Sequence, residues 1–242
     1  MDLTNGIKLG GIVEGFQRGT KHTKEYNLWL IERNAPTPSE KEITDSVPFM
    51  QGLYDFSTIL GERVYENRTI SYQFEIIEGD YQSRKLIQTQ LENWLMKDGY
   101  SPLYDDHAKG YYYMAKCTGV DIEDTSGGLT VDIEFNAYPF KISTLPEGHD
   151  IWDNIDFELD VLIPVEFDVN GSLEVNLLNV GITSVTPKIT TDAPMTIQKG
   201  NMTYEVKEGI TKSERFRLDA GENKLTINGN GHIEFEYRKE LI

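Results

Sequence analysis

The sequence predicts a mainly β fold in two domains: an amino-terminal α+β domain, formed by a β-sandwich-like sheet and one helix, and a carboxy-terminal β-sandwich. Apolar and polar residues alternate through most of the 242-residue chain, as half-buried strands require. One segment, residues 80–99, instead repeats its apolar residues about every 3.6 positions, which is the period of a helix. After residue 145 only the alternating pattern is found.

Two stretches of the first half show the strand pattern most clearly. The stretch "TISYQFEI" places Ile70, Tyr72 and Phe74 on one face, with polar residues on the other. The stretch "LTVDIEFNAY" does the same through Val131 and Ile133. Further alternating segments, separated by Gly, Asn, Asp and Pro, predict more strands in both halves of the chain.

One substantial helix is expected near residues 83–98. Asp80 or Ser83 would cap its start, and Gly99 would end it. Because the helix has a single apolar stripe, we expect that stripe to pack on the amino-terminal sheet. The stripe is formed by Ile87, Leu91 and Leu95, which lie four positions apart, with Leu86 and Trp94 flanking them.

A break in the strand pattern marks the expected domain boundary. The stretch "FNAYPFKIS" contains a proline, which has no amide hydrogen to give to a sheet ladder, so we expect the strand to end at Tyr138 and Pro139. The expected domains are therefore residues 1–144 and 145–242. Turn residues recur often in the second domain, which is typical of a β-sandwich, and Asn228–Gly231 is expected to form a hairpin turn.

The composition excludes several classes of partner. With 40 acidic and 23 basic residues, the net charge of -17 argues against direct affinity for nucleic acid or anionic lipid. No apolar run approaches the roughly 20 residues that span a bilayer, and the start "MDLTNGIKLGG" lacks the pattern of a signal peptide. We therefore expect no membrane segment, and a protein that stays in the cytoplasm or leaves it by another route. The single cysteine, Cys117, excludes an internal disulfide and is interpreted as a small buried residue.

Few residues are candidates for chemistry. Asp105, Asp106 and His107 favour a polar loop over a metal site, because adjacent residues seldom converge on one ion. The acids within residues 149–160 lack the spacing and the glycine of a calcium loop, which favours a solvated face. Alternation divides Tyr111–Tyr113 between two faces, so a core strand is favoured over a sugar-binding platform. We assign no catalytic, cofactor-binding or metal-ligating residue and expect neither a cofactor nor enzymatic activity.

Four stretches, together with the order of the elements, point to a known family. They are "VPFMQGLYDFS" before "RTISYQFEI", the helix ending in "NWLMKDG", the hairpin "YYYMAKCTGVDIEDTSGGLTVDIEFNAYPFKIS", and the end "LDAGENKLTINGNGHIEFEYR". In these the chain resembles the distal tail (Dit) proteins of long-tailed phages and prophages that infect Gram-positive bacteria. The resemblance covers most of the chain, and its motifs are structural rather than catalytic.

The resemblance implies an architectural protein of the phage tail tip or baseplate. In this family the amino-terminal domains form a ring, usually a hexamer, and a galectin-like or carbohydrate-module-like β-sandwich projects from each subunit. The ring joins the tail tube to the tail-tip and host-adsorption apparatus. The implied partners are further copies of the chain, the tail tube protein, the tape-measure protein, the tail-tip hub or tail-associated lysin, and a receptor-binding protein. The implied location is the virion tail tip, after assembly in the host cytoplasm.

The family also implies an arm that reaches onto the neighbouring subunit. The polar segment Asn34–Gly52 is long for a loop and is the candidate for that arm. No long insertion is found in the carboxy-terminal half, where some relatives carry an extra sugar-binding module. Two alternatives stay open: a carbohydrate-binding β-sandwich protein and, less favoured, a glycosidase with two carboxylates across a cleft. The candidate ring-interface residues are Asn34, Glu40, Glu42, Val47 and Phe49.

Overall fold

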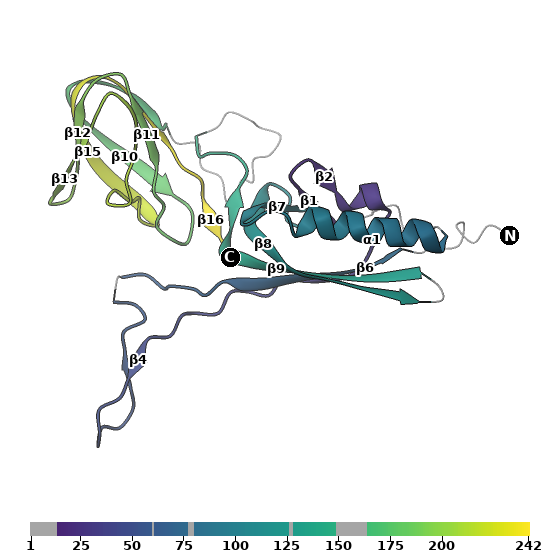
Figure 1. Ribbon diagram of the computed structural model, residues 1–242. Coiled ribbons are helices and arrows are strands. Elements are labelled where there is room, and N and C mark those ends of the chain that lie inside the picture. The colour runs from purple at the N-terminus through teal and green to yellow at the C-terminus, as the bar shows by residue number, and fades with distance from the viewer. Residues whose placement is uncertain (1–13, 60, 77–79, 126–127, 149–163) are drawn as a thin grey trace. The chain divides into compact units, whose positions relative to one another are not determined.

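The computed structural model describes residues 14–59, 61–76, 80–125, 128–148 and 164–242. It confirms the mainly β fold, with strands throughout and a single α-helix in the described residues (Figure 1). Contacts within the chain define two compact units. The first unit comprises Met1–Glu42 and Val64–Pro139, and the second comprises Ile43–Arg63 and Phe140–Ile242.

The first unit is built on one sheet with the strand order β2-β1-β7-β8-β9-β6-β3. Its long strands carry the alternation seen in the sequence: Ile70, Tyr72 and Phe74 are all buried, while the residues between them are more exposed. A short 3-10 helix, Thr23–Tyr26, follows β2. The strands are β1 (Phe16–Arg18), β2 (Lys21–His22), β3 (Trp29–Asn34), β6 (Arg68–Ile76), β7 (Ser101–Asp105), β8 (Tyr111–Thr125) and β9 (Gly128–Ser143).

The predicted helix is present as α1 (Tyr81–Leu95). Asp80 caps its start, because the carboxylate accepts a hydrogen bond from the Ser83 amide at 2.8 Å. The helix ends earlier than expected and not at Gly99. The carbonyl oxygens of Asp98 and Gly99 accept hydrogen bonds from the buried guanidinium of Arg18, at 3.0 and 2.8 Å, which holds this part of the chain outside the helix.

The apolar stripe of α1 packs on the core of the first unit, as predicted. Leu91 and Leu95 are completely buried, and Ile87 is partly buried against the same cluster. Phe16 occupies the centre of that core, with its ring centroid 4.9 Å from that of Tyr72. Aromatic packing of this kind adds to the free energy gained from burial alone.

The expectation that a strand ends at Tyr138 and Pro139 is wrong, because β9 continues to Ser143. The ladder between β9 and β6 ends at Ala137, and the ladder between β9 and β16 (Glu240–Leu241) begins at Lys141. Pro139 lies between these two ladders, so neither of them loses a hydrogen bond to its missing amide. The boundary between the two units falls directly after this proline.

The second unit contains a six-stranded sheet in the order β13-β12-β15-β11-β14, with β10 also paired to β15. The longest pairing joins β10 and β15 in one antiparallel register from Glu166 with Glu234 to Asn179 with Gly221. A separate apolar cluster, which includes Ile197, Ile227 and Phe235, fills the interior of this unit. The strands are β10 (Glu166–Asn179), β11 (Lys188–Thr191), β12 (Met195–Lys199), β13 (Met202–Val206), β14 (Gly209–Lys212) and β15 (Gly221–Glu236).

The hairpin turn expected at Asn228–Gly231 is not formed, because these residues lie inside β15 and pair with β10. Their glycines serve close packing instead. Gly229 and Gly231 have φ angles of 150° and 136°, which favour glycine. A Cβ on Gly229 would lie 2.7 Å from the Met195 side chain, and one on Gly231 would lie 2.1 Å from the Asp192 carboxylate.

Candidate functional site: an exposed arm

A long two-legged excursion, residues 35–67, leaves the sheet after β3 and returns at β6; we call it the arm. The sequence indicated only its first leg, within Asn34–Gly52. Near the sheet the two legs pair with each other as antiparallel strands do. The pairing consists of a bridge between Glu40 and Tyr65, a bond from the Glu66 amide to the Ser39 carbonyl at 2.9 Å, and one from the Lys41 amide to the Val64 carbonyl at 2.8 Å.

The outer part of the arm forms a small hairpin of β4 (Thr44–Asp45) and β5 (Tyr54–Asp55). The hydroxyl of Ser57 accepts a hydrogen bond from the Ile43 amide at 2.9 Å, which extends the pairing by one step. A hairpin of this size is marginal on its own in water, since only two residue pairs form its ladder. Phe49, in the tip, has a positive φ of 69°, which a bulky residue rarely adopts.

The root of the arm is fixed by a buried polar network in the first unit. Arg33, beside the start of the arm, donates to the Asp105 carboxylate at 2.6 Å, and the Tyr72 hydroxyl donates to the same oxygen at 2.8 Å. Burial alone would lower the pKa of Arg33, but the hydrogen bond and charge of Asp105 outweigh burial and raise that pKa. Burial and the neighbouring Asp105 carboxylate raise the pKa of Tyr72. At the start of β6, directly after the arm, Arg68 donates to the carbonyl of Pro36 at 3.1 Å.

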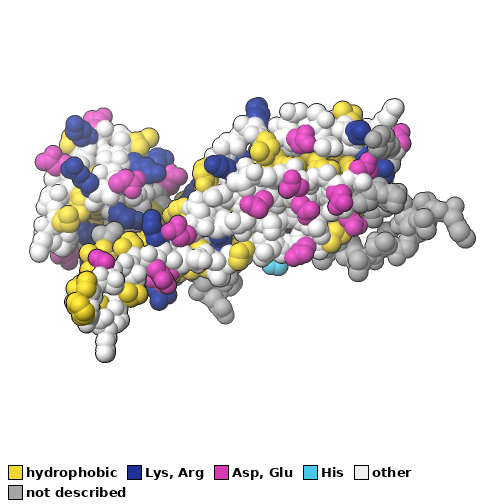
Figure 2. Space-filling view, turned by 60° about the horizontal axis from the view of Figure 1, so that its bottom comes forward, with side chains coloured by type: hydrophobic (Ala, Val, Ile, Leu, Met, Phe, Trp, Pro, Cys, Tyr) yellow, Lys and Arg dark blue, Asp and Glu magenta, His cyan; other side chains and the backbone are white. Residues whose placement is uncertain are grey.

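Apolar side chains are exposed along the outer part of the arm. Phe49 has a relative exposure of 106%, so its ring has no cover from the rest of the chain. Figure 2 shows hydrophobic side chains gathered on this part of the molecule, at the lower left. Exposed apolar side chains that gather in one place are typical of interaction sites, which makes this part of the arm a candidate site. The exposed residues are Ile43, Val47, Phe49, Leu53, Tyr54, Phe56 and Ile59.

The structure places the five candidate residues at different levels of the arm. Asn34 ends β3 and pairs with Ser71, so it belongs to the root. Glu40 and Glu42 lie on the outgoing leg, and Val47 and Phe49 lie in the tip. Their contact with a neighbouring subunit stays a prediction. Sequence reasoning missed the apolar residues of the second leg, although the quoted stretch "VPFMQGLYDFS" contains several of them.

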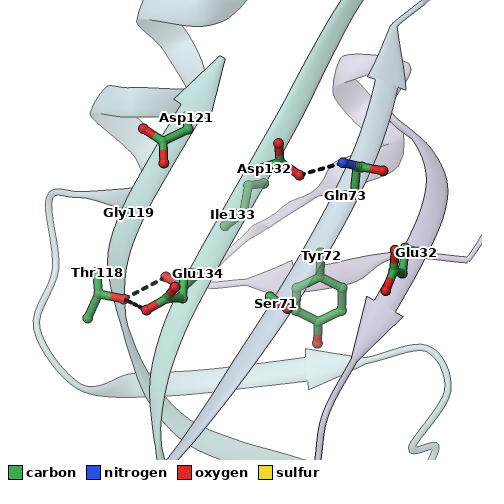
Figure 3. A pocket seen from close by; sticks show the side chains of 10 residues that line it. All are labelled: Glu32, Ser71, Tyr72, Gln73, Thr118, Gly119, Asp121, Asp132, Ile133 and Glu134. Carbon is green, nitrogen blue, oxygen red and sulfur yellow. Dashed lines mark hydrogen bonds between the residues drawn. The ribbon is translucent and has the colours of Figure 1, made fainter. Parts of the chain in front are cut away.

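A pocket of about 400 Å³ lies on the sheet of the first unit (Figure 3). Among its acidic side chains, Asp132 accepts a hydrogen bond from Gln73 at 2.9 Å, and Glu134 accepts one from the Thr118 hydroxyl at 3.3 Å. These two carboxylates lie two residues apart on β9, whereas the other two acids of the lining, Glu32 and Asp121, lie on β3 and β8. The lining residues are Glu32, Ser71, Tyr72, Gln73, Thr118, Gly119, Asp121, Asp132, Ile133 and Glu134.

The other sequence candidates do not gather into a site. Asp106 pairs with Lys24 at 2.7 Å and with His22 at 3.2 Å, whereas His107 lies 3.9 Å from Glu14. In the described part of the chain no group of His, Cys, Asp and Glu is arranged to hold a metal ion. Of the three adjacent tyrosines, Tyr113 is buried in the core. The acidic segment at residues 149–160 lies outside the described residues.

The fold is that of a phage distal tail protein. SPP1 Dit (gp 19.1), described as a paradigm of the hub adsorption apparatus in phages that infect Gram-positive bacteria, superposes with a TM-score of 0.68 at 14% identity, over 96% of this chain and 100% of that chain. The resemblance seen in the sequence is therefore confirmed at the level of the fold.

Other similarities are weaker. Chains of the phage p2 baseplate in its activated conformation, with strontium and with calcium, give TM-scores of 0.41 and 0.42 at 10% identity, over 95% and 96% of this chain and 98% and 99% of theirs. Scores below one half do not establish a common fold. No family model and no curated protein matches the sequence. Among the described residues, no helix has the length and apolar character needed to cross a membrane.

Proposed function

We propose that this chain is a structural component of a phage tail tip or baseplate and that it has no enzymatic activity. The observation that carries the proposal is the fold shared with SPP1 Dit over nearly the whole of both chains. The exposed arm supports it independently, because an apolar surface of this kind needs a protein partner.

The working form that we propose is a closed ring, with six subunits as in the Dit family. A ring requires a heterologous interface, in which one patch on each subunit meets a different patch on the next. The tip of the arm, with Val47 and Phe49, supplies one of these patches, and Glu40 and Glu42 add polar contacts along its first leg. Asn34 is placed to contribute at the root.

The further partners and the location that we propose follow from this role. The ring would join the tail tube protein, the tape-measure protein and the tail-tip hub or tail-associated lysin, and it would support a receptor-binding protein. It would assemble in the host cytoplasm and remain at the virion tail tip. The net charge of -17 fits a part that lies on the path of DNA without binding it.

Serine substitutions at the tip test the arm. Because Phe49 and Leu53 are exposed, replacing both by serine should change the free energy of unfolding by less than about 0.5 kcal/mol. The same variant should lose assembly in analytical ultracentrifugation at concentrations where the wild type forms rings. The matched control replaces Met202 and Ile210, two exposed apolar residues of the second unit, and should assemble normally. Normal assembly of the arm variant would contradict the proposed interface.

A further inference from the structure

One acidic residue of the arm is held by side-chain and backbone donors of the second unit. Glu62 lies on the returning leg, which contacts within the chain assign to that unit. One of its carboxylate oxygens accepts from the Ser184 hydroxyl at 2.8 Å, and the other accepts from the Ser184 amide at 3.0 Å and the Thr183 hydroxyl at 3.5 Å. The Arg217 guanidinium lies 3.7 Å from the first oxygen. Both oxygens of the carboxylate are therefore engaged.

The donors around Glu62 are fixed by bonds of their own. The side chain of Asn179 is completely buried and donates to the carbonyl oxygens of Thr183 and Leu218, at 2.9 and 3.1 Å. Arg217 donates to the Ser184 carbonyl at 3.0 Å. These bonds order residues 179–184 without any contribution from Glu62. Little conformational entropy is therefore lost when the Glu62 carboxylate binds there.

Close packing also restricts the backbone of residues 179–184. A Cβ on Gly181 would lie 2.9 Å from the Asn179 amide oxygen and 3.0 Å from the backbone of Glu240. The Ile182 amide donates to the Glu240 carbonyl at 3.0 Å. A preformed set of an amide, two hydroxyls and a guanidinium is the chemistry that binds a carboxylate.

We propose that Thr183, Ser184 and Arg217 form a carboxylate-binding site for Glu62 of the same chain, and that this contact positions the arm for assembly. The inference deepens the proposed function and rests on it where assembly is concerned. The small hairpin of the arm has no hydrophobic core of its own. It therefore needs a contact with another part of the chain to hold a single conformation. The ion pair of Arg33 with the buried Asp105 holds the root, and Glu62 holds the returning leg. An arm held in this way loses less entropy when its tip meets a partner.

Charge reversal at each partner tests the contact. Glu62→Lys and Arg217→Glu each place two like charges together, and the double variant places a cation and a carboxylate together again. The first readout is hydrogen exchange of the Phe56 amide, which donates to the Ile43 carbonyl at 2.8 Å inside the arm. Its exchange rate should rise about tenfold in each single variant and return toward the wild-type rate in the double variant. Glu66→Lys is the matched control, because Glu66 is an exposed acid on the same leg, and it should leave this rate unchanged.

The second readout is assembly, measured by native mass spectrometry for each variant and for an equimolar mixture of the two single variants. Each single variant should assemble at least about tenfold more weakly than the wild type, and the double variant should recover. The mixture should assemble as poorly as its components, because each chain carries its own broken contact. Recovery in the mixture would overturn the proposal, since it would place the contact between copies.

Unchanged exchange and unchanged assembly in both single variants would also overturn the proposal. A failure of the proposed function would give a different result, namely a wild-type chain that does not assemble. If the wild type forms no ring under any condition, the ring is wrong. The exchange rates of the monomer still decide whether Glu62 positions the arm.

Discussion

Asp105 is the residue on which the root of the arm depends most. Its side chain is only 2% exposed and accepts hydrogen bonds from both Arg33 and Tyr72. Replacing it by asparagine leaves the partly buried guanidinium of Arg33 without its counter-charge. We expect Asp105→Asn to lower the free energy of unfolding by about 3 to 5 kcal/mol, measured by urea denaturation. Asp106→Asn is the control, and because its ion pair is partly exposed, it should cost about 1 kcal/mol or less. Equal effects of the two substitutions would contradict this assignment.

The partner of Asp105 could not be identified from the sequence. The sequence predicted a polar loop for Asp105, Asp106 and His107, but Asp105 is the last residue of β7 and is buried. Arg33, however, is separated from Asp105 by 72 positions, and spacing cannot show which of many cations a buried acid meets. The same applies to Glu62 and Ser184, which are 122 positions apart.

His232 gives a pH dependence that is measurable at a single residue. The hydrogen bond from its ring to Asp168, at 2.9 Å, raises the pKa of His232. Since the folded-state pKa lies above the unfolded one, the stabilisation is fully present below the unfolded pKa of about 6.5 and is lost as the pH rises through the raised value. We expect Asp168→Asn to lower the pKa of His232 in an NMR titration. An unchanged titration curve would show that the contact does not form in solution.

Helix α1 shows how a periodic pattern predicts packing. The spacing of its apolar residues predicted both the helix and its buried face, because a repeat of about 3.6 residues is the period of a helix and places those residues on one side. Leu91→Ala should lower the free energy of unfolding by about 2 to 5 kcal/mol, measured by chemical denaturation. The control is Leu86→Ala on the exposed face of the same helix, where the side chain is 61% exposed and the expected change is within about 0.5 kcal/mol. A cost below about 0.5 kcal/mol at Leu91 would place the stripe on the surface.

The errors at the level of elements have one physical cause. Proline and glycine were interpreted as the ends of strands at Pro139 and at Asn228–Gly231, yet β9 and β15 continue through both places. Pro139 falls between two ladders, and the two glycines make room for Met195 and Asp192. Local sequence shows that such residues are special, but only the tertiary neighbours decide whether the strand ends there.

The arm was predicted in part for a related reason. A long polar segment after Asn34 indicated an excursion, but no pattern in the sequence indicated that the chain returns along a second leg. The pairing of Ser39 with Glu66 and of Lys41 with Val64 depends on contacts between distant positions. Sequence alone also does not distinguish an apolar side chain that packs in the core from one that stays exposed, as Phe49 and Leu53 do.

At the scale of the whole molecule, the division into domains 1–144 and 145–242 stays a prediction. We expect limited proteolysis to cut near residues 145–150 and to release two fragments that each unfold cooperatively. Mass spectrometry of the products, followed by thermal unfolding of each fragment, checks this. A single cooperative core with no cut in that segment would contradict the division.

The central claim is that the chain assembles into a ring, and the most direct test is its size and symmetry in solution. Light scattering of the wild-type chain at rising concentration, followed by electron microscopy of the largest species, measures both. We expect closed particles with six-fold symmetry, alone or after the neighbouring tail proteins are added. Only monomers or two-fold dimers, even with those proteins supplied, would contradict it and would make a carbohydrate-binding β-sandwich protein the leading alternative.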